Sequence, residues 1–329
     1  MVKGNIAPNY NETYDVDNTM KSVLTEVRQH PTTYIAGFYN CPNLKYINVR
    51  NCRLATNFAR KATYLEYVDV TNCKCGDKWR NCAGTFQDCI NLTDIVGLET
   101  LDFMTYAPKN IGSFFAGCQN LKESTIRKCE TWNVGTPETI SDMFTLCTQL
   151  TSIDLSGWDL SNATNLGNLC RECSNLKYVT LNLTGALKNI DYAFHLTSNL
   201  KSLKGLNDRV SNMFYTFREA LSNVEYLDID FTNTTAINYL YTCGTNNILT
   251  DINLTGTIGS VMDSTSSNHP KFFDKFTALS VDCLVKILNA LVDYSSESTT
   301  YTLTLGSVNL AKLNSEQIKI ATDKGWTLN

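Results

Sequence analysis

Apolar side chains recur along the chain in a short pattern that starts with a leucine. After it come two variable residues, an apolar residue, a polar residue and a second apolar residue, as in Leu150, Ile153 and Leu155. Alternation with a period of two predicts a short strand with one buried face. A leucine, or an equivalent valine, marks nine copies, at Leu44, Leu65, Leu92, Leu121, Leu150, Leu176, Leu200, Val224 and Leu249.

The spacing of these markers indicates a repeat architecture. Successive markers are separated by 21, 27, 29, 29, 26, 24, 24 and 25 residues. Self-similarity at such a period is typical of a solenoid, in which stacked coils place their strands in a parallel sheet. Upstream of the marker, an apolar pattern that ends in phenylalanine, as in residues 111–115 and 140–144, predicts a helical or 3₁₀ turn. We therefore expect an α/β fold with one short strand and one tight helical turn in each coil.

A cysteine stands three residues before the marker in five copies, at Cys41, Cys89, Cys118, Cys147 and Cys173. A metal site, a disulfide and a packing requirement are three explanations for this position, which we call the cysteine slot. Ala62 holds the slot in the second copy, which favours a small apolar side chain over a thiol. The chain has 13 cysteines, an odd number, and starts without an apolar leader, so we expect a reducing compartment and buried thiols.

Two terminal segments differ from the repeat and are expected to cover its ends. Residues 1–37 form a polar arm and a predicted cap helix over residues 18–29, between Asn18 as N-cap and Pro31 as stop. The solenoid is predicted over residues 38–258 and a C-terminal cap over residues 259–329.

The predicted C-terminal cap starts with a polar loop and continues as helix, strand and helix. Ser280 is the expected N-cap of the first helix, and TYTLTLG alternates as a strand. The second helix is expected to begin at a Ser315 cap and to end at Gly325. Trp326 and Leu328 are expected to pack back onto this segment.

The repeat resembles the BspA-like leucine-rich repeat family, whose units read approximately AFxxCxxLxxIxφ. MFTLCTQLTSIDLSGWDLSNATN, from Met143, is similar to a branch of the family that reads MFxxCxxLxxLDLSxWDxSNxTN. The resemblance covers roughly residues 38–256 and implies a curved leucine-rich-repeat solenoid of about nine coils. Copies two and nine lack the cysteine, and copy four has Ser124 at an apolar position, so we expect irregular geometry there.

The closing segment, with NLAKL followed by IATDKGWTL, looks like the C-terminal cap of repeat proteins encoded with phage tail or minor structural genes. This second resemblance covers about the last 50 residues. It implies a virion protein, made in the cytoplasm of a bacterial host, with other virion structural proteins as partners.

Composition and charge exclude several classes of partner. The net charge is −4 and no basic stripe is present, so we expect no nucleic-acid binding. The best apolar stretch, residues 283–292, is interrupted by Lys286 and Asn289 and is too short to span a bilayer. We expect no membrane insertion, and the pattern leaves homo-oligomerisation open.

No motif for catalysis or for a cofactor is present. Nucleophile-elbow, zincin, Walker and dinucleotide-binding motifs are absent, and His30, His195 and His269 lie far apart. His195 falls within a repeat, where we expect it to be partly exposed. Cys73, Cys75 and Cys82 form the only local thiol cluster, and the sequence leaves open whether they bind zinc together with Cys52 from the neighbouring copy. We expect neither an enzyme nor a cofactor.

The outward positions of the predicted strands are the candidate binding surface. Alternation places tyrosines two residues after the marker and polar residues two further on, on the expected concave face. Tyrosine rings stack on sugar faces and polar side chains hydrogen-bond to sugar hydroxyls, so these residues are suited to hold a glycan. For any single candidate, the simpler explanation is an ordinary solvent-facing strand residue with high β-propensity. The candidate residues are Tyr46, Asn48, Tyr67, Asp69, Tyr178, Tyr226 and Asp228.

Two functions fit these features. The first is a non-enzymatic virion component, a tail or fibre-like adhesin that binds a bacterial surface polysaccharide or protein. The alternative is a BspA-like adhesin or protein-interaction scaffold at the bacterial cell surface.

Overall fold

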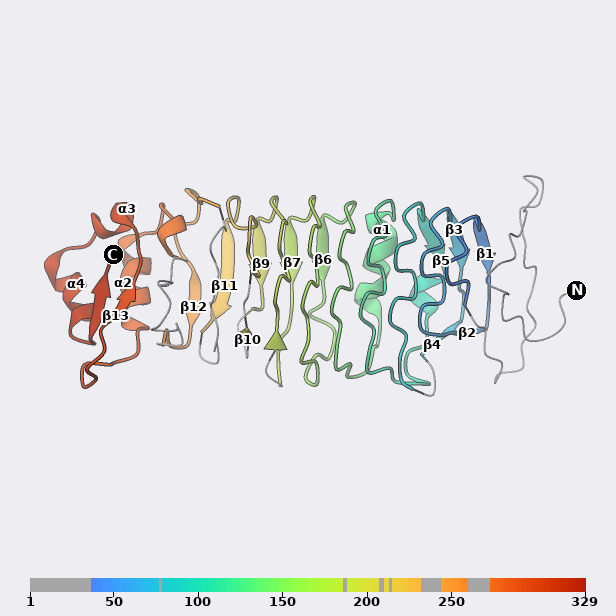
Figure 1. Ribbon diagram of the computed structural model, residues 1–329, viewed down its shortest axis with the longest axis horizontal. Coiled ribbons are helices and arrows are strands. Elements are labelled where there is room, and N and C mark those ends of the chain that lie inside the picture. The colour runs from blue at the N-terminus through green and yellow to red at the C-terminus, as the bar shows by residue number, and fades with distance from the viewer. Residues whose placement is uncertain are drawn as a thin grey trace, which may run out of the picture.

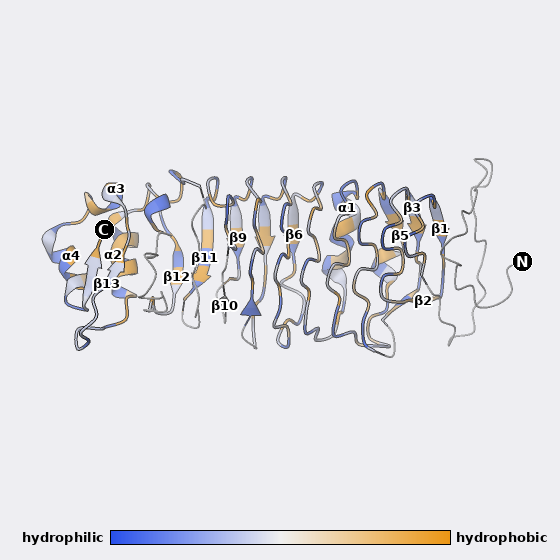
Figure 2. Ribbon diagram, in the orientation of Figure 1, coloured by the Kyte–Doolittle hydropathy of each residue, from blue (hydrophilic) through white to orange (hydrophobic). Residues whose placement is uncertain are grey.

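The computed structural model describes residues 37–76, 79–185, 188–206, 210–212, 215–231, 244–259 and 273–329. Its coils stack in one row along the long axis of the molecule (Figure 1). The predicted N-terminal cap helix and the polar loop after residue 259 lie outside the described residues. One hydrophobic core runs through the described coils from Leu44 to Trp326. Orange and blue residues alternate along most coils in Figure 2, as expected when one side of each coil faces this core.

The predicted strands pair in parallel, and they form two sheets on one face of the solenoid. The first has the order β1 (Tyr46–Asn48), β3 (Tyr67–Asp69), β5 (Asp94–Val96). The second contains, in spatial order, β6 (Ser152–Asp154), β7 (Tyr178–Thr180), β9 (Ser202–Lys204), β11 (Tyr226–Asp230) and β12 (Asn253–Thr255). Two shorter parallel pairs lie elsewhere, β2 (Arg53–Leu54) with β4 (Lys74–Cys75) and β8 (Lys188–Asn189) with β10 (Val210–Asn212).

Helices replace the strand in the fourth coil, where Ser124 interrupts the apolar pattern. A 3₁₀ helix η1 (Leu98–Thr100) lies before them, and α1 (Glu123–Ile126) and η2 (Arg127–Thr131) fill the place between β5 and β6. Strand β6 thereby loses a neighbour on one edge. Glu123 accepts a hydrogen bond from the backbone N–H of Ser152 at 3.0 Å, and Glu130 accepts one from that of Asp154 at 3.0 Å. Two carboxylates therefore take the place of the carbonyls of a missing strand.

Replacing Glu123 with alanine is expected to lower the free energy of unfolding by about 1–2 kcal/mol, because the N–H of Ser152 and two hydroxyls lose their acceptor. Partial burial acts to raise the pKa of Glu123, but hydrogen bonds from Thr151 and Ser152 together lower it below its usual 4.5. This stabilisation is present above the usual pKa and is lost as the pH falls through the lower folded pKa.

The matched control is Glu123→Gln, which keeps the acceptor oxygen and removes the charge. Urea unfolding at a series of pH values checks both variants. The stability gap between wild type and Glu123→Gln should close in acid. A gap that stays constant from neutral to acid pH would show that the charge of Glu123 does not support the edge of β6.

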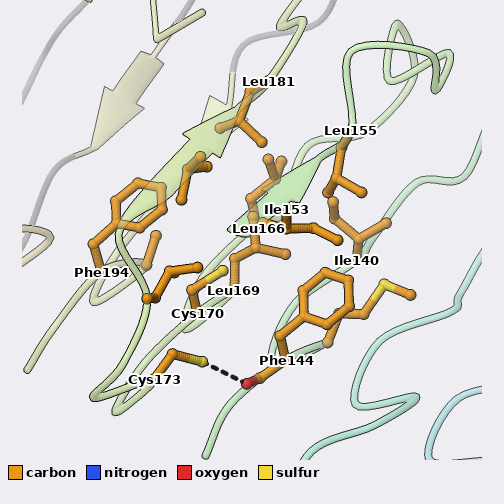
Figure 3. Packing of buried hydrophobic residues seen from close by; sticks show 14 of the residues in the cluster. Ile140, Phe144, Ile153, Leu155, Leu166, Leu169, Cys170, Cys173, Leu181 and Phe194 are labelled. Carbon is orange, nitrogen blue, oxygen red and sulfur yellow. Dashed lines mark hydrogen bonds between the residues drawn. The ribbon is translucent and has the colours of Figure 1, made fainter. Parts of the chain in front are cut away.

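From the third copy to the sixth, the cysteine slot is buried and its side chains bond to the preceding coil. Cys89, Cys118, Cys147 and Cys173 each donate to a backbone carbonyl oxygen of the preceding coil. That carbonyl stands six residues before the marker of its own coil. The sulfur–oxygen distances are 3.0 Å for Cys89 to Ala59, 3.1 Å for Cys118 to Phe86, 3.3 Å for Cys147 to Phe115 and 2.9 Å for Cys173 to Phe144. Figure 3 shows the last of these bonds among the buried side chains. All 12 described cysteines are free, and 11 of them are buried.

Volume alone therefore does not explain the slot. In the ninth copy the slot holds Asn246, whose Nδ2 atom donates to the carbonyls of Leu221 and Val224 at 2.7 and 2.8 Å. In the seventh copy it holds Thr197, whose hydroxyl donates to the Phe194 carbonyl at 2.6 Å. In most copies the slot thus holds a small side chain that also donates a hydrogen bond to a backbone carbonyl, whereas Ala62 and Leu221 fill it with buried apolar volume alone.

The predicted helical turns before the markers are instead irregular turns that join neighbouring coils. Ser113 and Gly117 have φ angles of 54° and 76°, and Asp142 and Leu146 repeat this arrangement with 59° and 61° in the next coil. The backbone N–H groups of residues 111, 113, 115 and 117 donate to the carbonyls of residues 139, 141, 143 and 145. In a helix these N–H groups would point along the helix axis. The residues with positive φ turn them toward the next coil instead, where they form a second ladder of hydrogen bonds between coils.

The C-terminal segment stacks on the ninth coil and carries more elements than the sequence predicted. It contains η3 (Phe273–Lys275), α2 (Val281–Asn289), β13 (Tyr301–Leu303), α3 (Ser307–Leu310), α4 (Ser315–Thr322) and β14 (Trp326–Leu328). Ser280 caps α2 as expected, whereas α4 is capped by Asn314 together with Gln317 and not by Ser315. Strand β14 pairs in parallel with β13. Trp326 is buried and its Nε1 donates to Val292 at 2.8 Å.

Candidate functional site

The candidate residues lie on one surface, formed by the outward side chains of β1, β3, β5, β6, β7, β9, β11 and β12. We call this surface the strand face. Figure 1 shows a nearly straight row of coils in this view. Parallel pairing places outward residues of neighbouring strands side by side, so equal positions of the repeat become rows across the strands.

The first group of candidates lies on the N-terminal sheet. Tyr46 pairs with Tyr67, and Asn48 pairs with Asp69. Tyr46 is 36% exposed, and its hydroxyl lies 3.2 Å from Glu66. Tyr67 and Asn48 are half-buried.

Asp69 is buried although it was expected on the open face. Its Oδ1 atom accepts hydrogen bonds from the Thr71 backbone N–H at 3.0 Å and hydroxyl at 2.6 Å, and its Oδ2 atom accepts from the Arg50 Nε atom at 2.7 Å. Burial acts to raise the pKa of Asp69, but the bonds from Thr71 and Arg50 together lower it. This carboxylate therefore fixes the loop after β3, and its oxygen atoms are already engaged.

The second group lies on the C-terminal sheet, beyond α1 and η2. Tyr178 on β7 is 51% exposed and Tyr226 on β11 is 40% exposed. Asp228, on the same strand as Tyr226, is buried. It accepts hydrogen bonds from the Tyr226 hydroxyl at 2.7 Å, from Asn253 Nδ2 at 2.8 Å and from the Gly205 backbone N–H at 3.1 Å. The bond to Asp228, followed by burial, raises the pKa of Tyr226.

The structure thus divides the seven candidates into two sets separated by the fourth coil. Four are on the first sheet and three on the second. Sequence reasoning missed Ser152 and Ser202, which occupy the row of Tyr178 and Tyr226. A signal for them was present, because both serines stand two residues after a marker, as the tyrosines do. Lys204 was also missed, and its Nζ atom lies 5.4 Å from the centre of the Tyr226 ring.

The cysteine cluster and His195 do not form a metal site in the described residues. No group of three or more His, Cys, Asp or Glu side chains there is arranged to hold an ion. Cys52 and Cys73 donate instead to the carbonyls of Arg50 and Val49 at 3.1 and 3.2 Å. His195 is only 6% exposed, so the expected partial exposure is wrong.

His195 is buried because its ring packs edge-on against Tyr192, with the ring centres 5.6 Å apart. Burial lowers the pKa of His195, and the neighbouring Arg171 and Arg218 lower it further. None of the helices in the described coils and C-terminal segment is long and apolar enough to cross a membrane.

Comparison with known proteins finds a matching family model and similar solved structures. A family model described as "Mycoplasma protein of unknown function, DUF285" matches residues 80–202. These residues lie inside the region that resembles BspA-like repeats. No curated protein matches the chain.

Among solved structures, a leucine-rich cell surface protein from Faecalibacterium prausnitzii matches with 17% identity and a TM-score of 0.28. The match covers 72% of this chain and 78% of that protein.

Proposed function

We propose that the chain is a non-enzymatic binding protein of the bacterial cell surface that holds a glycan or a protein on the strand face. The observation that carries the proposal is the set of exposed tyrosines on strands whose backbones are fixed by parallel pairing. Stacked coils create an extended surface of this kind, which repeat proteins use for binding. Tyrosine supplies a large contact area with few rotatable bonds, so little conformational entropy is lost on binding.

The cell surface is favoured over the virion as the place of action. The family description that matches residues 80–202 concerns Mycoplasma proteins, and the repeat resembles BspA-like surface proteins. The virion expectation rests only on the resemblance of the last residues to phage caps. Those residues contact the ninth coil, through bridges of Asn246 with Phe276 and of Ile258 with Leu291, which supports a structural role for them.

A hydrolytic function is disfavoured by the state of the carboxylates. Asp69 and Asp228 lie on different sheets, and the oxygen atoms of both accept hydrogen bonds from neighbouring residues. A glycosidase needs two carboxyl groups that face the same bond across about 5–10 Å. Asp69 and Asp228 therefore do not form a glycosidase pair, and we propose binding without chemistry.

Capture by single-alanine variants tests this proposal. The purified full chain, labelled with a fluorophore, is incubated with intact bacteria and with a glycan array. We expect Tyr46→Ala, Tyr67→Ala, Tyr178→Ala or Tyr226→Ala to weaken capture at least about fivefold, the loss expected for an aromatic contact worth about 1 kcal/mol. Tyr64→Ala is the control, because Tyr64 is 54% exposed but lies outside the strands. Equal capture by all five variants and wild type would exclude the strand face.

A further inference from the structure

Serine and tyrosine alternate in one row across the C-terminal sheet. Ser152 pairs with Tyr178, Tyr178 with Ser202, and Ser202 with Tyr226, on β6, β7, β9 and β11. Neighbouring strands are about 4.8 Å apart, so the bases of the two tyrosines are roughly 10 Å apart. Because the coils stack along the long axis, this row runs parallel to that axis (Figure 1).

The ring of Tyr226 is held in place before any ligand binds. Its hydroxyl donates to Asp228, which is itself held by Asn253 and by the backbone N–H of Gly205. The Nζ atom of Lys204 lies over the ring, 5.4 Å from its centre, and the side chain is exposed, so its ammonium group can donate to an oxygen of a ligand bound at this ring. A fixed ring loses little entropy on binding, which favours a stacking role.

The charges around the row are largely balanced within the protein. Lys201 pairs with Glu225, and Lys286 with Asp251, each with a nitrogen–oxygen distance of 2.8 Å. Exposed Asp154 and Lys204 have opposite signs and lie on the next row of the same sheet. Such a surface complements a ligand that carries hydroxyl groups and no net charge, more than a strongly anionic or cationic one.

The exposed face of this sheet carries few large apolar side chains. Among its described residues, the exposed large hydrophobic side chains are Tyr178 and Tyr226 alone. A stable protein interface buries a cluster of aromatic and aliphatic side chains at its centre. Two isolated rings with hydroxyl groups between them suit the C–H faces and hydroxyl edges of sugars better.

From these observations we propose that the row binds a linear, uncharged polysaccharide that lies along the solenoid axis. Alternate sugars stack on Tyr178 and Tyr226, and the sugar between them hydrogen-bonds to the hydroxyl of Ser202. A β-1,4-linked chain turns each sugar over relative to the last, so the same face returns at every second sugar, as the tyrosines return at every second strand. This inference names the ligand class for one part of the strand face and rests on the proposed function.

Titration calorimetry of the full chain with cellohexaose and chitohexaose tests the inference, with the helical maltohexaose as control. We expect at least one of the two β-1,4-linked hexasaccharides to bind and maltohexaose to bind at least about tenfold more weakly. Tyr178→Ala and Tyr226→Ala should each weaken binding about tenfold. Tyr64→Ala is the control, because Tyr64 is exposed but lies outside the strands; the affinity of this variant should equal that of wild type.

Chain length supplies a second readout that does not depend on variants. A disaccharide reaches one ring and a tetrasaccharide reaches both, so affinity should rise steeply between them in wild type and much less in Tyr226→Ala. Equal affinity for the two lengths would overturn the two-ring arrangement. Hexasaccharide binding that survives both tyrosine variants would place the sugar elsewhere.

Failure of this inference is distinguishable from failure of the proposed function. If neither β-1,4-linked hexasaccharide binds while Tyr178→Ala still weakens capture of bacteria, the ligand class is wrong and the strand face remains the binding surface. If capture is also unchanged in all the strand-face variants, both are wrong.

Discussion

Replacing Phe115 with alanine is expected to lower the free energy of unfolding by about 3–5 kcal/mol. Phe115 is fully buried at the centre of the solenoid. Its ring stacks between Phe86 and Phe144, with centre distances of 6.3 and 6.1 Å and interplanar angles of 10° and 20°. Trp132 contacts it from the same core at 5.9 Å. The substitution therefore opens a cavity between three coils, and the main-chain ladders restrict how far these coils can close it.

Urea unfolding followed by circular dichroism measures this effect. Phe115→Leu is the matched control, since it keeps most of the apolar volume, and it should cost clearly less than the alanine variant. Tyr178→Ala, on the exposed strand face, should leave stability within about 0.5 kcal/mol of wild type. A loss below about 1 kcal/mol for Phe115→Ala would mean that this ring is not packed between coils.

Asn246→Ala is expected to cost about 2–4 kcal/mol, the second-largest effect. The side chain is fully buried and makes four hydrogen bonds. Two go from Nδ2 to carbonyls of the eighth coil, and two reach Oδ1 from the N–H groups of Ile248 and Leu249. Alanine leaves these four backbone groups without their partner, and three of the four bonds, all except that from the N–H of Ile248, are buried away from water.

The control for Asn246 is Asn175→Ala. Asn175 also bridges two coils, through Nδ2 to the Thr148 carbonyl at 2.7 Å, but this bond is exposed and water can replace it. We expect a loss of less than about 1 kcal/mol there. Thermal and urea unfolding of both variants provide the comparison. Equal losses for the two would show that burial of Asn246 does not set its contribution.

The sequence predicted the repeat, the parallel strands and the buried cysteines, because all three follow from one short period of apolar positions. For the helices of the fourth coil, the only signal in the sequence was Ser124 at an apolar position. Their formation depends on Glu123 and Glu130 reaching the edge of β6, and such long-range acceptors leave no local pattern. The left-handed turns were missed because residues such as Leu146 and Tyr192 rarely adopt positive φ, and here the inter-coil ladder fixes them.

The sequence predicted where the candidate residues lie, but only partly which of their side chains are open to a ligand. Alternation placed Tyr178 and Tyr226 on the open face, where they are exposed. The same alternation could not show that Asp69 and Asp228 are covered, because Arg50 and Tyr226 reach them through side-chain geometry. The serine–tyrosine row emerges only when the register of four strands is known.

The central claim is that equal positions of successive coils form rows, of which the cysteine slot is the buried example. Alkylation of the native full chain with iodoacetamide, followed by peptide mass mapping, tests it most directly. Burial raises the pKa of the Cys118 and Cys147 thiols as well as shielding them. We expect Cys89, Cys118, Cys147 and Cys173 to stay unmodified in the folded protein and to react fully in urea. Rapid native labelling of these residues, or disulfide-linked peptides between them, would contradict the stacking.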